Sequence, residues 1–153
     1  MPRVTATIEL PGLVYDAETC WYDVGRWPEW VDGLARIVEV RGDWPKVGSE
    51  VVWESHPAGR GTVRERVTEY GPRSGQTSDV DDDSVTARQS VSFQPLADGV
   101  QLQLALEYSL KRRSPVSWLV DLVFIRRLMG SSLGRTLNRF QAVLSNSPPS
   151  PFK

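Results

Sequence analysis

Two polar residues occupy strand positions where apolar side chains are expected. Glu65 and Gln89 each stand between apolar residues two positions before and two positions after. Because side chains alternate between the two faces of a strand, both should point to the apolar side. An unsatisfied polar group there costs about 1–3 kcal/mol. We therefore expect them to bind a ligand hydroxyl, or Glu65 to act as a general acid or base. The alternative is a β-bulge or a carboxylate paired with an arginine.

Three aromatic residues are also candidates for contact with a ligand. Tyr108 falls on the apolar side of its strand, where the hydroxyl can donate to a bound carbonyl or reach the rim of the core. It joins Glu65 and Gln89 as a candidate catalytic residue. Trp27 and Trp30 are three residues apart, so their rings share one side of a helix. This spacing predicts that the two rings either form the lip of an entrance to a ligand site or anchor the helix against a sheet.

The sequence contains few residues suited to metal binding or nucleophilic catalysis. His56 is the only histidine and Cys20 the only cysteine, which excludes disulfides within the chain and zinc-finger spacings. The acidic segment 79–83 lacks the glycine and the terminal glutamate of an EF-hand loop. We expect an exposed His56, no metal site and no cofactor.

Hydrophobic periodicity defines the elements that must position these residues. Alternation predicts strands, and two short helical segments lie where alternation stops between Leu13 and Leu34. Apolar residues at steps of three, four or seven predict one long helix from Ser114 to Ser145. A turn is expected over residues 95–99. The predicted strands cover residues 4–10, 35–41, 47–55, 61–70, 76–80, 85–93 and 100–110.

This order of elements predicts an α+β fold. One strand, two short helices, about six antiparallel strands and a long helix place the long helix on one face of a curved antiparallel sheet. At 153 residues the chain suits a single domain, which we assign to residues 1–145. Residues 146–153 form an expected flexible, proline-rich tail.

Charge and hydropathy limit the partners. A net charge of -1 lacks the basic excess of a nucleic-acid binder, so no nucleic-acid partner is expected. A single cysteine and the lack of an apolar signal segment predict a cytoplasmic setting. Val116 to Ile125 is an apolar segment bracketed by basic residues, which predicts transient membrane contact or a buried half of the long helix.

Three short motifs resemble a known family. They are Asp23-Val24-Gly25-Arg26-Trp27-Pro28-Glu29-Trp30, Val47-Gly48-Ser49-Glu50-Val51 and Pro95-Leu96-Ala97-Asp98-Gly99-Val100. With the order of elements, they resemble the polyketide cyclase/dehydrase branch of the SRPBCC (START-like, helix-grip) superfamily. The resemblance implies a helix-grip fold, in which the sheet wraps around the C-terminal helix. It also implies a cavity between the two for lipids, sterols, polyketides, quinones or other hydrophobic molecules.

The apolar sides of the strands and of the long helix supply the wall of such a cavity. The alternative is that the apolar members of this set fill a solid core. The predicted ligand-binding residues are Trp27, Trp30, Val51, Trp53, Val63, Glu65, Val67, Gln89, Val91, Phe93, Leu104, Leu106, Tyr108, Leu119, Leu122 and Met129.

Three functions fit these features. The first is binding of a small hydrophobic, lipid-, polyketide- or aromatic-like molecule between the sheet and the C-terminal helix. The second is a polyketide cyclase, aromatase or dehydratase in which Glu65, Gln89 or Tyr108 moves protons. The third is a lipid or quinone carrier that docks on membranes.

Overall fold

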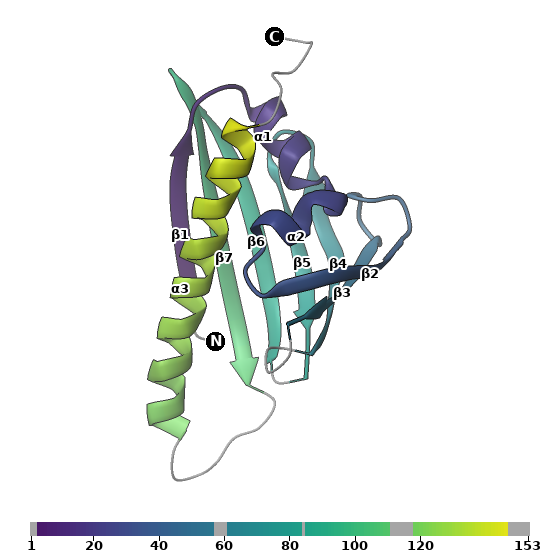
Figure 1. The fold of residues 1–153 in the computed structure, drawn as a ribbon, viewed down its shortest axis with the longest axis vertical. Helices are drawn as coiled ribbons and strands as arrows, with labels where there is room; N and C mark the ends of the chain where they lie inside the picture. The colour runs from purple at the N-terminus through teal and green to yellow at the C-terminus, as the bar shows by residue number, and fades with distance from the viewer. Residues whose placement is uncertain (1–2, 57–60, 84, 111–117, 147–153) are drawn as a thin grey trace.

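The computed structural model describes residues 3–56, 61–83, 85–110 and 118–146, without the side chains of residues 110 and 118–128. Within these residues it contains one seven-stranded sheet and three α-helices (Figure 1). In chain order, the elements are β1 (Arg3–Leu10), α1 (Val14–Trp21), the 3-10 helix η1 (Val24–Arg26), α2 (Trp27–Trp30), β2 (Leu34–Arg41), β3 (Glu50–Ser55), β4 (Thr62–Gly71), β5 (Gly75–Asp81), β6 (Val85–Leu96), β7 (Gly99–Leu110) and α3 (Trp118–Ser145).

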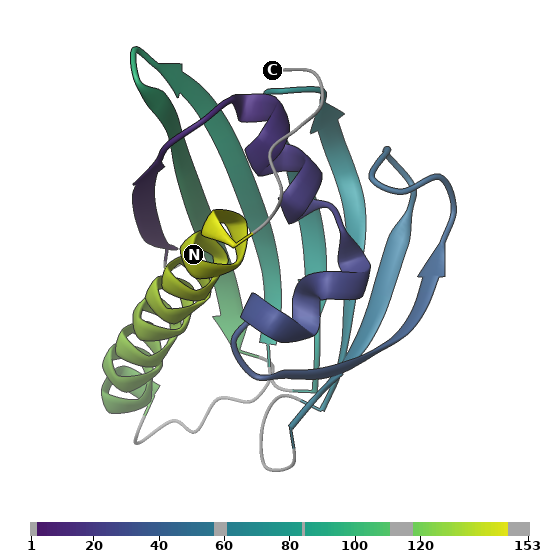
Figure 2. The same cartoon turned by 45° about the horizontal axis from the view of Figure 1, so that its top comes forward.

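The sheet is antiparallel throughout, in the order β1-β7-β6-β5-β4-β3-β2. Strands β2 to β7 follow one another as a meander, and β1 pairs with β7 at the other edge. Figures 1 and 2 show a curved sheet with α1, α2 and α3 on the same face. The predicted α+β helix-grip architecture is confirmed.

Period-two alternation explains the face that the helices cover. On β6 and β7, Val91, Phe93 and Leu104 are at most 5% exposed, whereas Arg88 and Gln103 on the opposite face are exposed. Burying one large apolar side chain stabilises the fold by about 1.5–3 kcal/mol. The apolar residues of the strands therefore fix which face of the sheet packs against the helices.

The long helix α3 packs along β1 and contacts α1 and α2. Leu133, Leu137 and Phe140 are at most 7% exposed and follow one another at steps of four and three, as the stripe predicted. The ring of Phe140 lies 5.0 Å from those of Trp21 and Trp30. These contacts fix the short helices and α3 to each other above the sheet.

Element boundaries differ from the sequence predictions at two turns. Strand β3 begins at Glu50 rather than at residue 47, because Gly48 has a φ of +89° and the N–H of Gly48 donates to the carbonyl of Val67 at 2.9 Å. Strand β6 continues through Pro95 to Leu96, so the turn predicted over residues 95–99 is shorter.

Two predictions fall wholly or partly outside the described residues. The structure describes α3 from Trp118, and the predicted helix start over residues 114–117 lies outside it. The tail from residue 147 onward also lies outside it. In the described part of the chain, no helix is long and apolar enough to cross a membrane.

Candidate functional site

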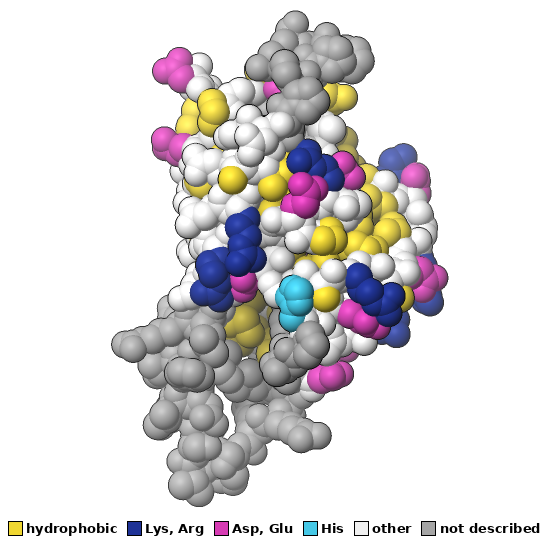
Figure 3. Space-filling view, viewed as in Figure 1, with side chains coloured by type: hydrophobic (Ala, Val, Ile, Leu, Met, Phe, Trp, Pro, Cys, Tyr) yellow, Lys and Arg dark blue, Asp and Glu magenta, His cyan; other side chains and the backbone are white. Residues whose placement is uncertain are grey.

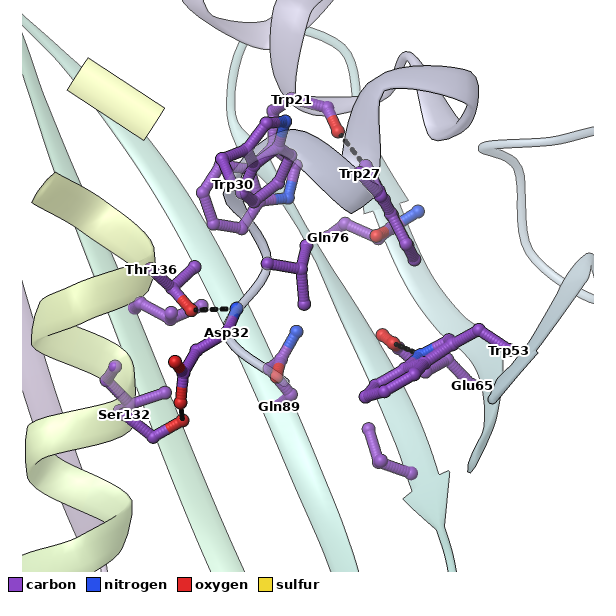
Figure 4. Close-up of a pocket in the computed structure, with 14 residues that line it drawn as sticks. Trp21, Trp27, Trp30, Asp32, Trp53, Glu65, Gln76, Gln89, Ser132 and Thr136 are labelled. Atoms are coloured by element: carbon purple, nitrogen blue, oxygen red, sulfur yellow. Dashed lines mark hydrogen bonds between the residues drawn. The ribbon is translucent and has the colours of Figure 1, made fainter. Parts of the chain in front are cut away.

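A cavity of about 60 Å³ lies between the sheet, the short helices and α3 (Figure 4). Residues of α1, of α2 and the turn after it, of β3 to β7 and of α3 contribute to its lining. They are Trp21, Trp27, Trp30, Val31, Asp32, Trp53, Glu65, Gln76, Val80, Gln89, Leu104, Ser132, Leu133 and Thr136.

The helical wall of the cavity consists mainly of tryptophan rings. Trp27 and Trp30 are 4% and 1% exposed, so they are buried anchors and not an exposed lip. The rings of Trp21 and Trp30 lie 4.6 Å apart, and Nε1 of Trp27 donates to the carbonyl of Trp21 at 2.8 Å. Aromatic packing of this kind adds about 0.5–1.5 kcal/mol per pair beyond area burial. This wall is therefore well fixed.

The sheet wall carries the polar groups. Glu65 is 7% exposed, and its Oε2 accepts a hydrogen bond from Nε1 of Trp53 at 2.6 Å. Glu65 pairs in register with Val51 and Val80, so regular alternation and not a β-bulge turns it inward. Gln89 is part-buried, and the prediction that both side chains reach the interior is confirmed.

The third wall is a set of polar contacts that we call the Asp32 clasp, formed by Asp32, Ser132, Arg135, Thr136 and Arg139. The Asp32 carboxylate accepts from Ser132 Oγ at 2.7 Å, from Arg135 Nε and Nη2 at 3.1 Å each, and from Arg139 Nη1 at 3.3 Å. The backbone N–H of Asp32 donates to Thr136 Oγ1 at 3.0 Å. The clasp therefore joins the turn after α2 to α3.

The clasp changes the acidity of Asp32. Partial burial by itself raises the pKa of this carboxyl. Hydrogen bonds from Arg135 and Ser132, with the charges of Arg135 and Arg139, outweigh that effect and hold the pKa of Asp32 below its ordinary value. Asp32 is thus an anion that the two arginines hold in place.

Several predicted lining residues do not border this cavity. Tyr108 is fully buried, and Met129 is part-buried against the core. The side chains of Leu119 and Leu122 lie outside the described part of the chain. The residues that pack in the interior instead of lining the cavity are Val51, Val63, Val67, Val91, Phe93, Leu106 and Tyr108.

Sequence reasoning missed a further group of lining residues. Alternation along β5 could have identified Gln76 and Val80, and the stripe of α3 could have placed Ser132 and Thr136 beside it. Nothing in its local pattern marks Asp32. The missed residues are Trp21, Val31, Asp32, Gln76, Val80, Ser132, Leu133 and Thr136.

His56 and Asp82, two of the side chains considered for metal binding, do not line the cavity. His56 is exposed, as predicted, and is the cyan side chain in Figure 3. Asp82 is 3% exposed and its Oδ1 accepts from the backbone N–H of Val85 at 2.8 Å, so it shapes the β5–β6 turn. Among the described residues, no group of three histidine, cysteine or acidic residues could hold a metal ion.

Solved structures with the same fold are numerous. StfQ, a di-domain ARO/CYC from the steffimycin biosynthetic pathway, is 18% identical over 94% of this chain, with a TM-score of 0.76. This chain spans half the length of StfQ. TTHA0849 from Thermus thermophilus is 17% identical, with 95% of this chain and 100% of that chain covered and a TM-score of 0.76.

A third similar structure is a START superfamily protein from Mycobacterium smegmatis. It is 16% identical, with 94% of this chain and 97% of that chain covered and a TM-score of 0.74. At these identities the likeness shows the fold alone. No curated protein matches the sequence.

The family is shown by its sequence model, described as polyketide cyclase / dehydrase and lipid transport, which matches residues 1–145. This match confirms the resemblance drawn from the three motifs and supports a ligand-binding or cyclase role. The chain belongs to the polyketide cyclase/dehydrase and lipid transport family.

Proposed function

We propose that the protein binds a small hydrophobic molecule, with an aromatic, polyketide-like or lipid-like body, in the cavity between the sheet and α3. The observation that carries the proposal is the lining of the cavity. Four tryptophans form much of it, while polar groups come from the sheet and from the Asp32 clasp, namely Glu65, Gln76, Gln89, Asp32, Ser132 and Thr136. Small-molecule sites have this composition, because apolar walls supply affinity and a few polar groups fix orientation.

The cavity in this structure is smaller than the site that a drug-sized ligand needs. A volume of about 60 Å³ is enough for a few waters or one functional group. A cavity of about 150 Å³ accommodates benzene, and sites for drug-sized ligands span about 300–1,000 Å³. A ligand of that size therefore needs one wall to move.

The Asp32 clasp is the wall best suited to movement. Strand pairing fixes the sheet wall, and aromatic packing fixes the tryptophan wall. The clasp relies on ion pairs in which the Arg135 and Arg139 side chains are about half exposed, at 51% and 49%. Solvent weakens such pairs.

The turn that carries Asp32 is not tightly packed at the next residue. Gly33, at a φ of +80°, follows Asp32 and has no neighbouring atom within 4 Å of the position that a Cβ would occupy. The turn therefore has room to shift.

A dye titration tests the proposal. A solvatochromic apolar dye should bind the native protein with one-to-one stoichiometry. Gln89→Trp should block binding, since the larger ring fills the cavity. Ser90→Trp is the matched control, because residue 90 is next on β6 and faces the outer side, opposite Thr77 and Ala105. Absence of saturable binding in the native protein, or equal binding by both variants, contradicts the proposal.

A catalytic role is the second candidate, favoured by the buried Glu65 carboxylate in the cavity wall. A carboxylate in the wall of a cavity can act as a general base toward a bound substrate within hydrogen-bond reach. The probe 5-nitrobenzisoxazole, which opens to a coloured phenolate when a base removes its ring proton, reports such basicity. Glu65→Gln should abolish turnover, and Glu18→Gln, at another buried carboxylate, should leave it intact. Equal turnover by native protein and Glu65→Gln excludes Glu65 as the base.

Two earlier expectations remain predictions. Membrane docking depends on Val116 to Ile125, whose side chains lie outside the described residues. Co-sedimentation with anionic and neutral vesicles tests it, since binding through basic residues should fall with salt. The cytoplasmic setting rests on the presence of one cysteine in the sequence, Cys20, whose side chain is buried.

A further inference from the structure

The indole N–H of Trp30 is a buried hydrogen-bond donor that lacks an acceptor among the described residues. The residue is 1% exposed and lines the cavity. Buried polar groups in native proteins are nearly always hydrogen bonded, so each exception needs an explanation. Because the Trp30 side chain lines the cavity, an acceptor on a bound ligand offers such an explanation.

Other tryptophans show the usual arrangement. Trp27 donates to the carbonyl of Trp21 at 2.8 Å, and Trp44 donates to the carbonyl of Tyr22 at 2.8 Å. Trp53 donates to Glu65 Oε2 at 2.6 Å. The fold thus supplies acceptors to three buried or part-buried indoles but, among the described residues, none to Trp30.

The Trp30 ring is held rigidly. Its centroid lies 4.6 Å from that of Trp21, 5.0 Å from that of Phe140 and 6.2 Å from that of Trp27. The ring cannot turn its N–H toward another acceptor without disrupting these contacts. The donor is therefore preorganised, and a ligand that uses it pays little ordering entropy.

Gln89 provides a second polar group. Its side chain lines the cavity, is part-buried and has no hydrogen-bond partner in the described part of the chain. Figure 4 shows it between Asp32 on one side and the Trp53–Glu65 pair on the other. An amide both donates and accepts hydrogen bonds, so Gln89 can pair with either a donor or an acceptor on a ligand. Trp30 can only donate, and so it sets the stricter requirement.

We propose that Trp30 Nε1 determines specificity at this site by donating a hydrogen bond to an oxygen of the ligand. This inference rests on the proposed function and adds the ligand's chemistry. The cavity selects a ring compound that carries a carbonyl oxygen over a hydrocarbon of the same shape. The apolar rings contact the ligand body, and Trp30 binds its oxygen.

A matched pair of probes tests this requirement. Acetophenone and α-methylstyrene have nearly the same shape, but one carries C=O where the other carries C=CH₂. The native protein should bind acetophenone about five- to tenfold more tightly, as expected for one buried hydrogen bond. In Trp30→Phe the preference should disappear. Comparing both probes in both proteins cancels the general effect of the smaller ring.

A second readout uses the native protein alone and does not depend on the variant folding. The indole proton signal of Trp30 in a ¹H–¹⁵N spectrum should move farther downfield with acetophenone than with α-methylstyrene. Equal affinities, or no difference at this signal, overturn the inference and leave the proposed function intact. This is also the result expected if an ordered water serves as the acceptor. Binding of neither probe overturns both the inference and the proposed function.

Discussion

Asp32 and Arg135 form a two-point contact across 103 residues of sequence, with Arg135 Nε on Oδ1 and Nη2 on Oδ2, each at 3.1 Å. The paired geometry suits a guanidinium and a carboxylate. It joins the turn after α2 to α3 at the edge of the cavity, where both side chains contact solvent. The contact thus belongs to the wall that, in our proposal, moves to admit a ligand larger than the cavity.

Removing the clasp should speed ligand entry. Asp32→Ala eliminates every carboxylate contact of the clasp and keeps the backbone hydrogen bond to Thr136. We expect the association rate of an apolar dye to rise severalfold in stopped-flow measurements. The free energy of unfolding should fall by only about 1 kcal/mol, because solvent screens the pairs. Asp43→Ala is the control, since it removes an exposed pair with Lys46 elsewhere. An unchanged association rate for Asp32→Ala shows that the clasp is not the gate.

The clasp should also make stability depend on pH. The pKa of Asp32 is lowered in the folded protein, so its contribution is fully present above the unfolded value of about 3.9. It is lost as pH falls through the folded pKa. In urea unfolding between pH 7 and pH 3, native protein should therefore exceed Asp32→Asn in stability by an amount that shrinks below about pH 4. A gap that stays constant over this range indicates that the charge of Asp32 contributes nothing.

Two substitutions of Glu65 separate the effect of its charge from the effect of its hydrogen bond to Trp53. Glu65→Gln keeps an acceptor for Trp53 Nε1, so we expect a stability change below about 1–2 kcal/mol. Glu65→Leu leaves that indole N–H unpaired and should cost about 1–3 kcal/mol more. Chemical denaturation of both variants measures the difference. Equal stability would mean that the hydrogen bond contributes little to the fold.

The outer face of the sheet carries a row of alternating charge. Arg88 on β6 stands in register between Asp79 and Glu107, and its Nε lies 3.4 Å from Asp79 Oδ1. In register order across six strands, the row is Glu50, Arg66, Asp79, Arg88, Glu107 and Arg3.

Reversing one charge in this row should destabilise the protein. Arg88→Glu places three negative charges side by side and should lower the free energy of unfolding by about 1–2 kcal/mol at low salt. High salt should reduce the effect. Ser92→Glu, at an exposed position on the same face between Gly75 and Gln103, is the control and should change stability little. A salt-independent loss for Arg88→Glu would point to packing rather than charge.

Local periodicity is what made part of the site predictable. Glu65 and Gln89 were expected to point inward because the alternation of a strand depends only on neighbouring residues. The same logic covers Gln76, which begins the strand predicted over residues 76–80. These three residues supply the polar groups of the sheet wall.

Contacts between distant segments could not be predicted in this way. Trp30 is buried because Phe140 of α3 packs on it, and Asp32 matters because α3 brings Arg135 beside it. Neither partner is visible in the local sequence. Cavity walls and solid core use the same apolar residues, so the pattern could not separate Leu104, which lines the cavity, from Phe93, which does not.

The most direct test of ligand binding in this cavity is a titration of the native protein with α-methylstyrene, followed through its indole signals in ¹H–¹⁵N spectra. Trp21, Trp27, Trp30 and Trp53 line the cavity, whereas Trp44 does not and serves as an internal control. Assignment by single Trp→Phe variants identifies each signal. We predict that the four signals shift along one saturable curve while the Trp44 signal moves little. Signals that do not shift, or that all drift together without saturation, would contradict binding in this cavity.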